Sequence, residues 1–314
     1  MKVLIVDIDS TIKNVALEKI RLYHQLKGDE IVYNLPLYAS ICDKIYVSCV
    51  FEFNNHLCKE WEGKAEIGGT GVDLLKTLPP EIDEMKPKIN IGFTTRGCVH
   101  KCYFCVVPRK EGKIRVTGDI YDFWDGKSKK IVLLDNNILG LPEQFLKISA
   151  QIKKENLRVD FNGGMDFRLI TDDLCKEIFS MKHLFEIRFA FDDYSYKPKI
   201  LKALEMLRRN GMKDWSTRWY IYVGVKDTFD TVLERCNIIH SNKQLCYIMR
   251  DRDPIVQENK QFIALAKWTN WAVFFKYEFF DVVRKSHHFA DYRPYFGMNG
   301  VDSILDDITD NIMF

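Results

Sequence analysis

Residues 96–105 read RGCVHKCYFC and bring Cys98, Cys102 and Cys105 into one short stretch with the spacing C-x3-C-x2-C. A structural zinc site takes four protein ligands, and a catalytic zinc site usually keeps three. A four-iron cluster is normally held by four thiolates, so three thiolates leave one iron open to another ligand. The spacing therefore predicts either a cluster with one open iron or a zinc site completed by His100 or by a distant cysteine.

Alternating strand and helix patterns surround this stretch and predict an α/β fold. Apolar runs typical of strands occur in six places: residues 89–95, 131–135, 158–162, 185–191, 218–225 and 244–249. Helical patterns lie between them, for example at residues 142–154 and 228–240. This alternation indicates parallel strands, although six strands fall short of the eight that close a full barrel. The chemistry of such folds lies at the carboxyl ends of the strands, and the cysteine stretch directly follows the first run.

Residues 92–98, GFTTRGC, and residues 105–108, CVVP, carry a family resemblance. Together with the C-x3-C-x-aromatic-C spacing they resemble the cluster loop of radical S-adenosylmethionine enzymes, especially the methylthiotransferase-like and cobalamin-domain-containing branches. The resemblance implies that Cys98, Cys102 and Cys105 hold a 4Fe–4S cluster whose open iron binds S-adenosylmethionine. It also implies an open, partial (β/α)6 barrel over residues 87–255 and a one-electron donor of the flavodoxin or ferredoxin type.

The resemblance further implies a set of cofactor-binding residues in the cysteine stretch and at the strand ends: Phe104, Asp135, Asn136, Gly163, Gly164, Arg168 and Asp192. Phe104 is expected near the adenine, Arg168 near the cofactor carboxylate, and Asp192 near the ribose hydroxyls. Asp135 and Asn136 stand where many relatives carry a Gly-Gly-Glu motif that this chain lacks. The alternative for each polar residue is a surface loop group or a buried salt bridge. No catalytic residue is assigned, because the reaction subtype is open.

Residues 1–86 are expected to form a small doubly wound, Rossmann-like domain. Strand patterns occur in four places: residues 2–6, 30–33, 44–50 and 66–71. The segment resembles a cobalamin-binding domain, in which a His in a D-x-H-x-x-G loop ligates cobalt from below. Residues 7–12 read DIDSTI and lack that His. We therefore expect a degenerate domain that caps the barrel or shapes the substrate site, with bound cobalamin as the alternative.

The six remaining cysteines are expected to be core thiols rather than ligands of a second cluster: Cys42, Cys49, Cys58, Cys175, Cys236 and Cys246. Cysteine in an apolar strand or helix often behaves as a small hydrophobe. Methylthiotransferases hold a second cluster through three N-terminal cysteines at wider spacings and append an RNA-binding module. Neither pattern is visible here, which argues against that reaction.

Composition limits the remaining possibilities. The chain has 314 residues, of which 46% are hydrophobic, and a net charge of +2. Nucleic-acid-binding domains are usually strongly basic, so the charge does not support a nucleic-acid partner. No signal peptide or membrane-length apolar run is visible, and nine cysteines then favour a reducing, cytoplasmic setting. Residues 256–314 are expected to be a helical, aromatic-rich extension that packs on the barrel, its aromatic side chains forming core rather than a base-stacking surface.

These observations lead us to expect an enzyme that cleaves S-adenosylmethionine reductively and uses the resulting 5′-deoxyadenosyl radical to abstract hydrogen from a substrate that the sequence does not identify. Rearrangement, carbon–carbon bond formation and methylation all stay open. One alternative is a cobalamin-dependent radical methylase. Another is a non-catalytic protein that binds zinc or an iron–sulfur cluster and presents its N-terminal domain to a partner.

Overall fold

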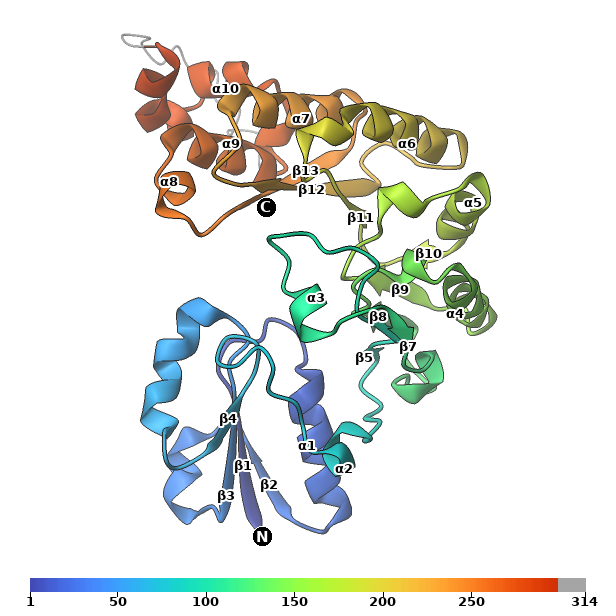
Figure 1. Ribbon diagram of the computed structural model, residues 1–314, viewed down its shortest axis with the longest axis vertical. Coiled ribbons are helices and arrows are strands. Elements are labelled where there is room, and N and C mark those ends of the chain that lie inside the picture. The colour runs from blue at the N-terminus through green and yellow to red at the C-terminus, as the bar shows by residue number, and fades with distance from the viewer. Residues whose placement is uncertain (299–314) are drawn as a thin grey trace. The chain divides into compact units, whose positions relative to one another are not determined.

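Four parallel strands near the N-terminus form the first sheet, in the order β2-β1-β3-β4 (Figure 1). Their bounds are β1 Lys2–Asp7, β2 Glu30–Tyr33, β3 Lys44–Ser48 and β4 Glu66–Gly68. The central strand β1 buries four successive residues, as expected for a parallel strand that is covered on both faces. The four strand predictions in this part of the chain are confirmed.

Among residues 1–298, which the structure describes, nine further strands pair in three sheets. Their bounds are β5 Ile91–Gly92, β6 Thr95–Arg96, β7 Arg115–Val116, β8 Lys130–Leu133, β9 Arg158–Phe161, β10 Lys182–His183, β11 Ile187–Ala190, β12 Thr217–Val223 and β13 Leu245–Arg250. One sheet has the order β10-β9-β8-β5, one has the order β11-β12-β13, and β6 pairs with β7 in an antiparallel ribbon. The pairs β5–β8, β11–β12 and β12–β13 are parallel.

Helices connect most of these strands. The α-helices are α1 Val15–Leu26, α2 Pro80–Asp83, α3 Val107–Lys110, α4 Pro142–Lys154, α5 Asp172–Ser180, α6 Lys197–Arg209, α7 Phe229–Ser241, α8 Pro254–Gln257, α9 Lys260–Asn270 and α10 Phe279–Lys285. The 3-10 segments are η1 Pro36–Ile41, η2 Glu52–Trp61, η3 Ile120–Asp122, η4 Ile138–Gly140, η5 Phe167–Leu169, η6 Tyr194–Tyr196, η7 Phe274–Lys276 and η8 His287–Phe296. The predicted helices at residues 142–154 and 228–240 correspond to α4 and α7.

The structure, a computed structural model, describes residues 1–298. The chain divides into two compact units, with the boundary between Val159 and Asp160 inside β9. Within the described residues the fold is mixed α/β with parallel sheets, which confirms the predicted class. The finer prediction of a domain at 1–86, a partial barrel at 87–255 and an extension at 256–314 stays a prediction. Residues 299–314 of that extension lie outside the described part.

All six strand patterns between residues 89 and 249 contain strands, but the first one is interrupted. The pattern at residues 89–95 predicted one strand, and the chain instead forms β5 and β6 with a break at Phe93 and Thr94. Thr94 and Thr95 both turn their polar groups toward the carboxylate of Asp135, which follows β8. This contact leads the chain out of the β5–β8 sheet just before the cysteines.

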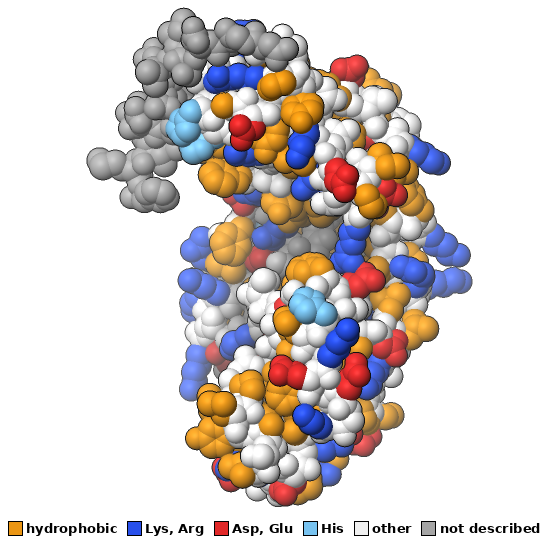
Figure 2. Space-filling view, turned by 90° about the vertical axis from the view of Figure 1, so that its left-hand side faces the viewer, with side chains coloured by type: hydrophobic (Ala, Val, Ile, Leu, Met, Phe, Trp, Pro, Cys, Tyr) orange, Lys and Arg blue, Asp and Glu red, His pale blue; other side chains and the backbone are white. Residues whose placement is uncertain are grey.

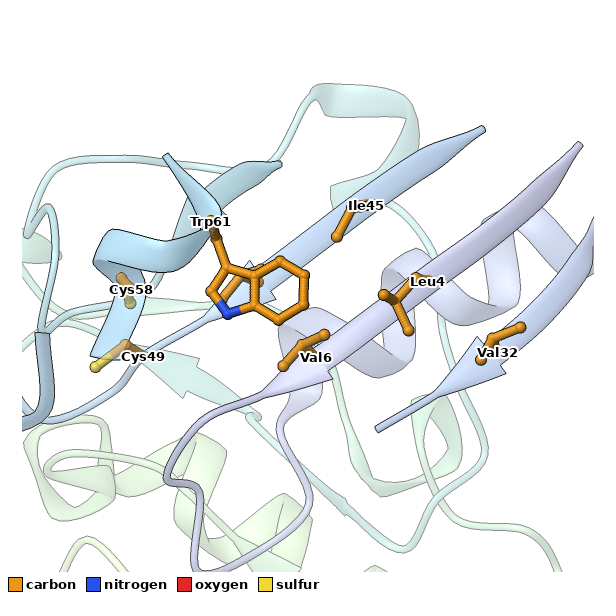
Figure 3. Packing of buried hydrophobic residues seen from close by; sticks show 8 residues of the cluster. Leu4, Val6, Val32, Ile45, Cys49, Cys58 and Trp61 are labelled. Atoms are coloured by element: carbon orange, nitrogen blue, oxygen red, sulfur yellow. The ribbon is translucent and has the colours of Figure 1, made fainter. Parts of the chain in front are cut away.

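Each face of the first sheet has its own hydrophobic core. Leu4 and Val6 pack on one face against Trp61 of η2 (Figure 3). Val3 and Ile5 lie on the other face, in a cluster with the buried residues of α1. The buried members of both clusters all fall between residues 3 and 82. The N-terminal sheet therefore has a core that uses no residue from the cysteine stretch.

The aromatic residues near the C-terminus are mostly buried. Trp268, Phe274, Phe275, Phe279 and Phe289 are almost fully enclosed and stack edge to face or tilted against one another. They form core, as the sequence predicted, whereas Trp271 and Phe280 of the same segment are 56% and 41% exposed and depart from that prediction. No helix among residues 1–298 has the length and apolar character needed to cross a bilayer. On the face shown in Figure 2, basic, acidic and hydrophobic side chains are interspersed.

Trp61→Ala tests the core of the first sheet. Trp61 is 4% exposed, and its indole N–H has no hydrogen-bond partner among the described residues, so truncation removes packing alone. We expect the free energy of unfolding of the N-terminal sheet to fall by about 3–5 kcal/mol in urea titrations followed by circular dichroism. The control Leu37→Ala truncates a side chain that is 94% exposed. It should change the free energy of unfolding by less than about 0.5 kcal/mol. Equal effects of the two substitutions would contradict this packing.

Candidate metal centre

Cys98, Cys102 and Cys105 lie in the loop between β6 and α3, which we call the thiol loop (residues 97–106). All three side chains are partly exposed and unoxidised. A metal ligand must be reachable and must ionise, and partly exposed thiols in one loop meet the first condition. Among the described residues, no group of three or more His, Cys, Asp or Glu side chains is arranged around a metal position.

Five of the other six cysteines are buried, which agrees with their prediction as core thiols: Cys49, Cys58, Cys175, Cys236 and Cys246. Burial raises the pKa of the Cys49 thiol to about 12 and that of Cys175 to about 11. Thiols with raised pKa values are poor ligands and poor nucleophiles at neutral pH. The remaining one, Cys42, is partly exposed, and burial also raises its pKa.

A glycine turn opens the thiol loop. Gly97 has φ +84°, and a Cβ on it would lie 2.4 Å from the backbone oxygen of Lys113. Both the backbone angle and the close approach require glycine here. The backbone N–H of Gly97 donates to Glu111 Oε2 at 2.8 Å, and Glu111 Oε1 pairs with Arg96 Nη2 at 2.7 Å. Cys98 N donates to the Gly112 oxygen at 3.3 Å, so these contacts close the base of the loop.

Three successive residues that follow β8 contact the thiol loop or the residues on either side of it. Asp135 Oδ1 accepts hydrogen bonds from the backbone N–H and the hydroxyl of both Thr94 and Thr95. Asn136 Nδ2 donates to Glu111 Oε2 at 2.6 Å. The residue after it, Asn137, donates from Nδ2 to the sulfur of Cys98 at 3.6 Å. The carboxyl end of β8 thus fixes the thiol loop before, beside and at its first cysteine.

Asp135 is the most unusual group of this set. Its second oxygen, Oδ2, is buried and has no hydrogen-bond partner among the described residues. Burial raises the pKa of Asp135 although the Thr95 and Thr94 donors oppose the shift. An orphaned buried acceptor is costly, and such groups are usually completed by a ligand, an ion or water. Asp135 therefore keeps one buried oxygen that fits a hydrogen-bond donor.

The three thiols of the loop are the ligand type that zinc and iron–sulfur clusters take, and one of them, Cys98, accepts two N–H donors. Besides the Asn137 amide, the backbone N–H of His100 donates to Cys98 Sγ at 3.4 Å. Donors of this kind stabilise a thiolate ligand and orient it. Phe104 is partly exposed beside them, with its ring edge to face against Tyr103 at 5.2 Å. Of the predicted residues in the first unit, the three cysteines and Phe104 share the thiol loop, without converging on one metal position among the described residues. Asp135 and Asn136 contact the residues on either side of that loop.

The predicted cofactor-binding residues of the second unit occupy neighbouring strand ends. Gly164 follows β9 with φ +82° and lies against the backbone of Arg188, while Gly163 is exposed. Asp192 follows β11, and its Oδ1 accepts from Tyr222 N at 3.1 Å. The turn after β9 requires Gly164 for its own geometry.

Arg168 is held by a carboxylate that the sequence interpretation did not use. Its Nε and Nη2 donate to the two oxygens of Asp166 at 2.8 and 2.9 Å, and Nη1 lies 3.5 Å from the hydroxyl of Tyr196. The structure therefore shows a partly buried salt bridge for this residue, close to the alternative given for it. Only the Nη1 side of the guanidinium remains for a further acceptor.

Arg235 is a further residue that the sequence interpretation missed. It is fully buried on the inner face of α7, where its Nη1 donates to the backbone oxygens of Phe191, Asp192 and Tyr222 at 2.9–3.2 Å. Its Nη2 donates to Asp227. The detectable signal was an arginine on the apolar face of a helix, which is rare unless the charge has partners. Arg235 fixes the carboxyl ends of β11 and β12 and so the place of Asp192.

Comparison with known proteins gives no family. No family model matches the chain, and no curated protein sequence matches it. The function is therefore inferred from the residues of the site.

Asp192→Asn tests the electrostatics of the strand ends. Burial raises the pKa of Asp192 to about 6, although the Tyr222 N–H and the charges of Arg235 and Arg168 oppose the shift and Asp166 adds to it. A raised carboxyl pKa makes the wild-type free energy of unfolding fall as pH rises from about 4 to about 6. The free energy of unfolding of Asp192→Asn, relative to that of the wild type, should thus rise by up to about 3 kcal/mol between pH 4 and pH 7.5.

The measurement is urea unfolding at both pH values, with Asp193→Asn as the matched control. The Ser195 hydroxyl and N–H lower the pKa of Asp193, so its stabilising contribution is present above the usual carboxyl range and is lost as pH falls. The free energy of unfolding of Asp193→Asn, relative to that of the wild type, should therefore fall between the two pH values, by a smaller amount. Identical pH dependence of wild type and Asp192→Asn would contradict the raised pKa.

Proposed function

We propose that the chain is a radical S-adenosylmethionine enzyme in which Cys98, Cys102 and Cys105 bind a 4Fe–4S cluster. The observation that carries the proposal is one loop with three partly exposed thiols, held against the carboxyl end of a parallel strand. When bound, such a cluster with an open iron supplies the electron that splits S-adenosylmethionine into methionine and a 5′-deoxyadenosyl radical. The substrate that loses the hydrogen is not specified by these residues.

The chain's own residues would bind and orient the reactants. Asp135 offers its buried, unpartnered Oδ2 to the amino group of the cofactor. Phe104 offers a partly exposed ring next to the cysteines for the adenine. In the second unit, taken by itself, we propose Asp192 as an acceptor for hydroxyl groups and Arg168 Nη1 as a donor to an anionic group, while Asp166 balances the Arg168 charge. Glu111 and Asn136 hold the loop and are positioning residues.

The proposed fold for this chemistry is a partial (β/α)6 barrel. Two observations support it. Strands that follow one another along the chain are neighbours in the sheets β5-β8-β9 and β11-β12-β13, apart from the short edge strand β10. The pairs β5–β8, β11–β12 and β12–β13 are parallel. The thiol loop and Asp135, and likewise Asp192, lie at the carboxyl ends of such strands, where barrel chemistry is found.

The N-terminal domain fits a degenerate relative of a cobalamin-binding domain. At the carboxyl edge of its sheet, the Asp9 carboxylate accepts the backbone N–H groups of Val50 and Phe51 at 2.7 and 2.9 Å. A Cβ on Gly69 would lie 2.2 Å from the Cys49 oxygen, so this glycine packs against the chain itself. These contacts hold the loops at this edge to one another, and we propose a role without cobalamin for the domain.

This domain also contacts α3, the short helix that follows the thiol loop. The Lys110 ammonium at the end of α3 donates to the hydroxyl of Thr70, which follows β4. Burial lowers the pKa of Lys110, and the Arg96 charge adds to the shift. A partly buried lysine that joins these two elements supports our proposal that the domain caps the barrel or shapes the substrate site.

The surface beside the thiol loop fits an acidic one-electron donor of the flavodoxin or ferredoxin type. Four basic side chains are exposed there: Lys101, Arg109, Lys113 and Arg115. The nearby Glu111 pairs with Arg96 and does not offset them. Tyr103, which is 81% exposed, adds an apolar contact. Basic charge around an apolar centre raises association rates with acidic partners.

The proposed role of the three cysteines is tested by anaerobic reconstitution of the protein with iron and sulfide, followed by addition of dithionite and S-adenosylmethionine. We expect about four irons per chain and formation of 5′-deoxyadenosine even without substrate. Replacing Cys98, Cys102 and Cys105 together by alanine should abolish both, because no thiolate of the loop remains. Cys42→Ala, a partly exposed cysteine outside the loop, is the control and should keep both. Zinc in place of iron, with no cleavage product, would instead support a non-catalytic metal-binding protein, and bound corrinoid would support the methylase.

The donor surface is tested with Lys113→Glu combined with Arg115→Glu. At low salt, cluster reduction by flavodoxin should slow by roughly tenfold, because charge steering is reversed. The difference should shrink above about 0.5 M salt, where exposed charges are screened. Stopped-flow absorbance measures the rate.

Two controls accompany this measurement. Lys127→Glu reverses an exposed charge elsewhere in the first unit and should leave the rate unchanged. Reduction by dithionite should be equal in all variants. Unchanged flavodoxin rates in the double variant would show that the donor binds elsewhere.

A further inference from the structure

Asn137 stands apart from its two neighbours at the end of β8, because it alone of the three contacts a sulfur. Its side chain is 4% exposed, and Nδ2 lies 3.6 Å from Cys98 Sγ. Asp135 contacts Thr94 and Thr95, and Asn136 contacts Glu111. The sequence interpretation used the first two of these residues and assigned nothing to Asn137.

The backbone around Asn137 is anchored. Ile138 and Leu139, which follow it in η4, are 1% exposed each, and Gly140 N donates back to the Asn137 oxygen at 3.0 Å. A Cβ on Gly140 would lie 3.0 Å from Val99 Cγ1, so η4 packs directly against the thiol loop. A side chain held by such a turn keeps its direction toward Cys98 without a large entropic cost.

An N–H donor on a ligand sulfur changes the electronics of whatever that sulfur binds. Reduction adds negative charge to an iron–sulfur cluster, and part of that charge lies on the thiolate sulfurs. A donor to the sulfur stabilises the reduced form more than the oxidised form, and so raises the reduction potential. Cys98 Sγ also accepts from His100 N at 3.4 Å, but a backbone donor is common to any side chain at that position.

We propose that Asn137 is a positioning residue that raises the reduction potential of the cluster through its amide hydrogen bond to the Cys98 sulfur. This inference rests on the proposed function, since it requires a cluster on Cys98. According to this inference, a single side chain adjusts how readily the cluster accepts an electron from its protein electron donor. The role differs from holding the loop, which Asp135 and Asn136 share.

The test compares three full-length variants after anaerobic reconstitution. Asn137→Leu keeps the approximate shape and removes the donor, and Asn137→Asp keeps the shape and replaces the donor by an acceptor. Asn136→Leu is the matched control, because it removes the adjacent amide, which bonds Glu111 and not sulfur. The midpoint potential is measured by redox titration with electron paramagnetic resonance and normalised to the cluster present, so that incomplete loading does not alter it.

We expect the potential of both Asn137 variants to shift to more negative values and that of Asn136→Leu to stay at the wild-type value. The shift should be larger in Asn137→Asp, because its carboxylate adds charge beside the sulfur. Wild-type potentials in both Asn137 variants, or an equal shift in Asn136→Leu, would overturn the inference while leaving the cluster in place. A wild-type protein that binds no iron would overturn the proposed function itself, and the inference with it.

Discussion

The Asp135 carboxylate, with its hydrogen bonds from Thr94 and Thr95, is the contact on which the arrangement of the thiol loop depends. A buried carboxyl is expensive to desolvate and is tolerated only where donors surround it. Four donors converge on one oxygen, which fixes the point where the chain leaves β5. The glycine turn at Gly97 then directs the following cysteines, so a single buried group sets the start of the site.

Polar contacts at strand ends serve the same purpose in the second unit. Arg235 joins the backbone ends of β11 and β12, and Asp166 fixes Arg168. In both units, side chains that look like ligand-binding groups are first used to hold the strand ends in place. A site built on such anchored elements is ordered before a ligand arrives, which lowers the entropic cost of binding.

Much of the fold was readable from the sequence because it depends on local patterns. The strands of the first sheet and, after it, β8, β9, β11, β12 and β13 follow from apolar runs, and α4 and α7 follow from helical periodicity. The break between β5 and β6 was not readable, since it depends on a contact between Thr94 and a residue 41 positions later. The same holds for the site: the cysteines are visible as a motif, whereas Asn137 and Arg235 act through partners far along the chain. The pairing of Arg168 with Asp166 was within reach, because the two residues are neighbours in sequence.

The central claim is that three cysteines of one loop hold a four-iron cluster with one iron open to S-adenosylmethionine. Mössbauer spectroscopy of the protein reconstituted with 57Fe, recorded with and without S-adenosylmethionine, tests it most directly. The account predicts that one of the four irons changes its spectrum when the cofactor is added and that the other three do not. A spectrum unchanged by the cofactor, or a protein that takes up zinc and no iron, would contradict the account.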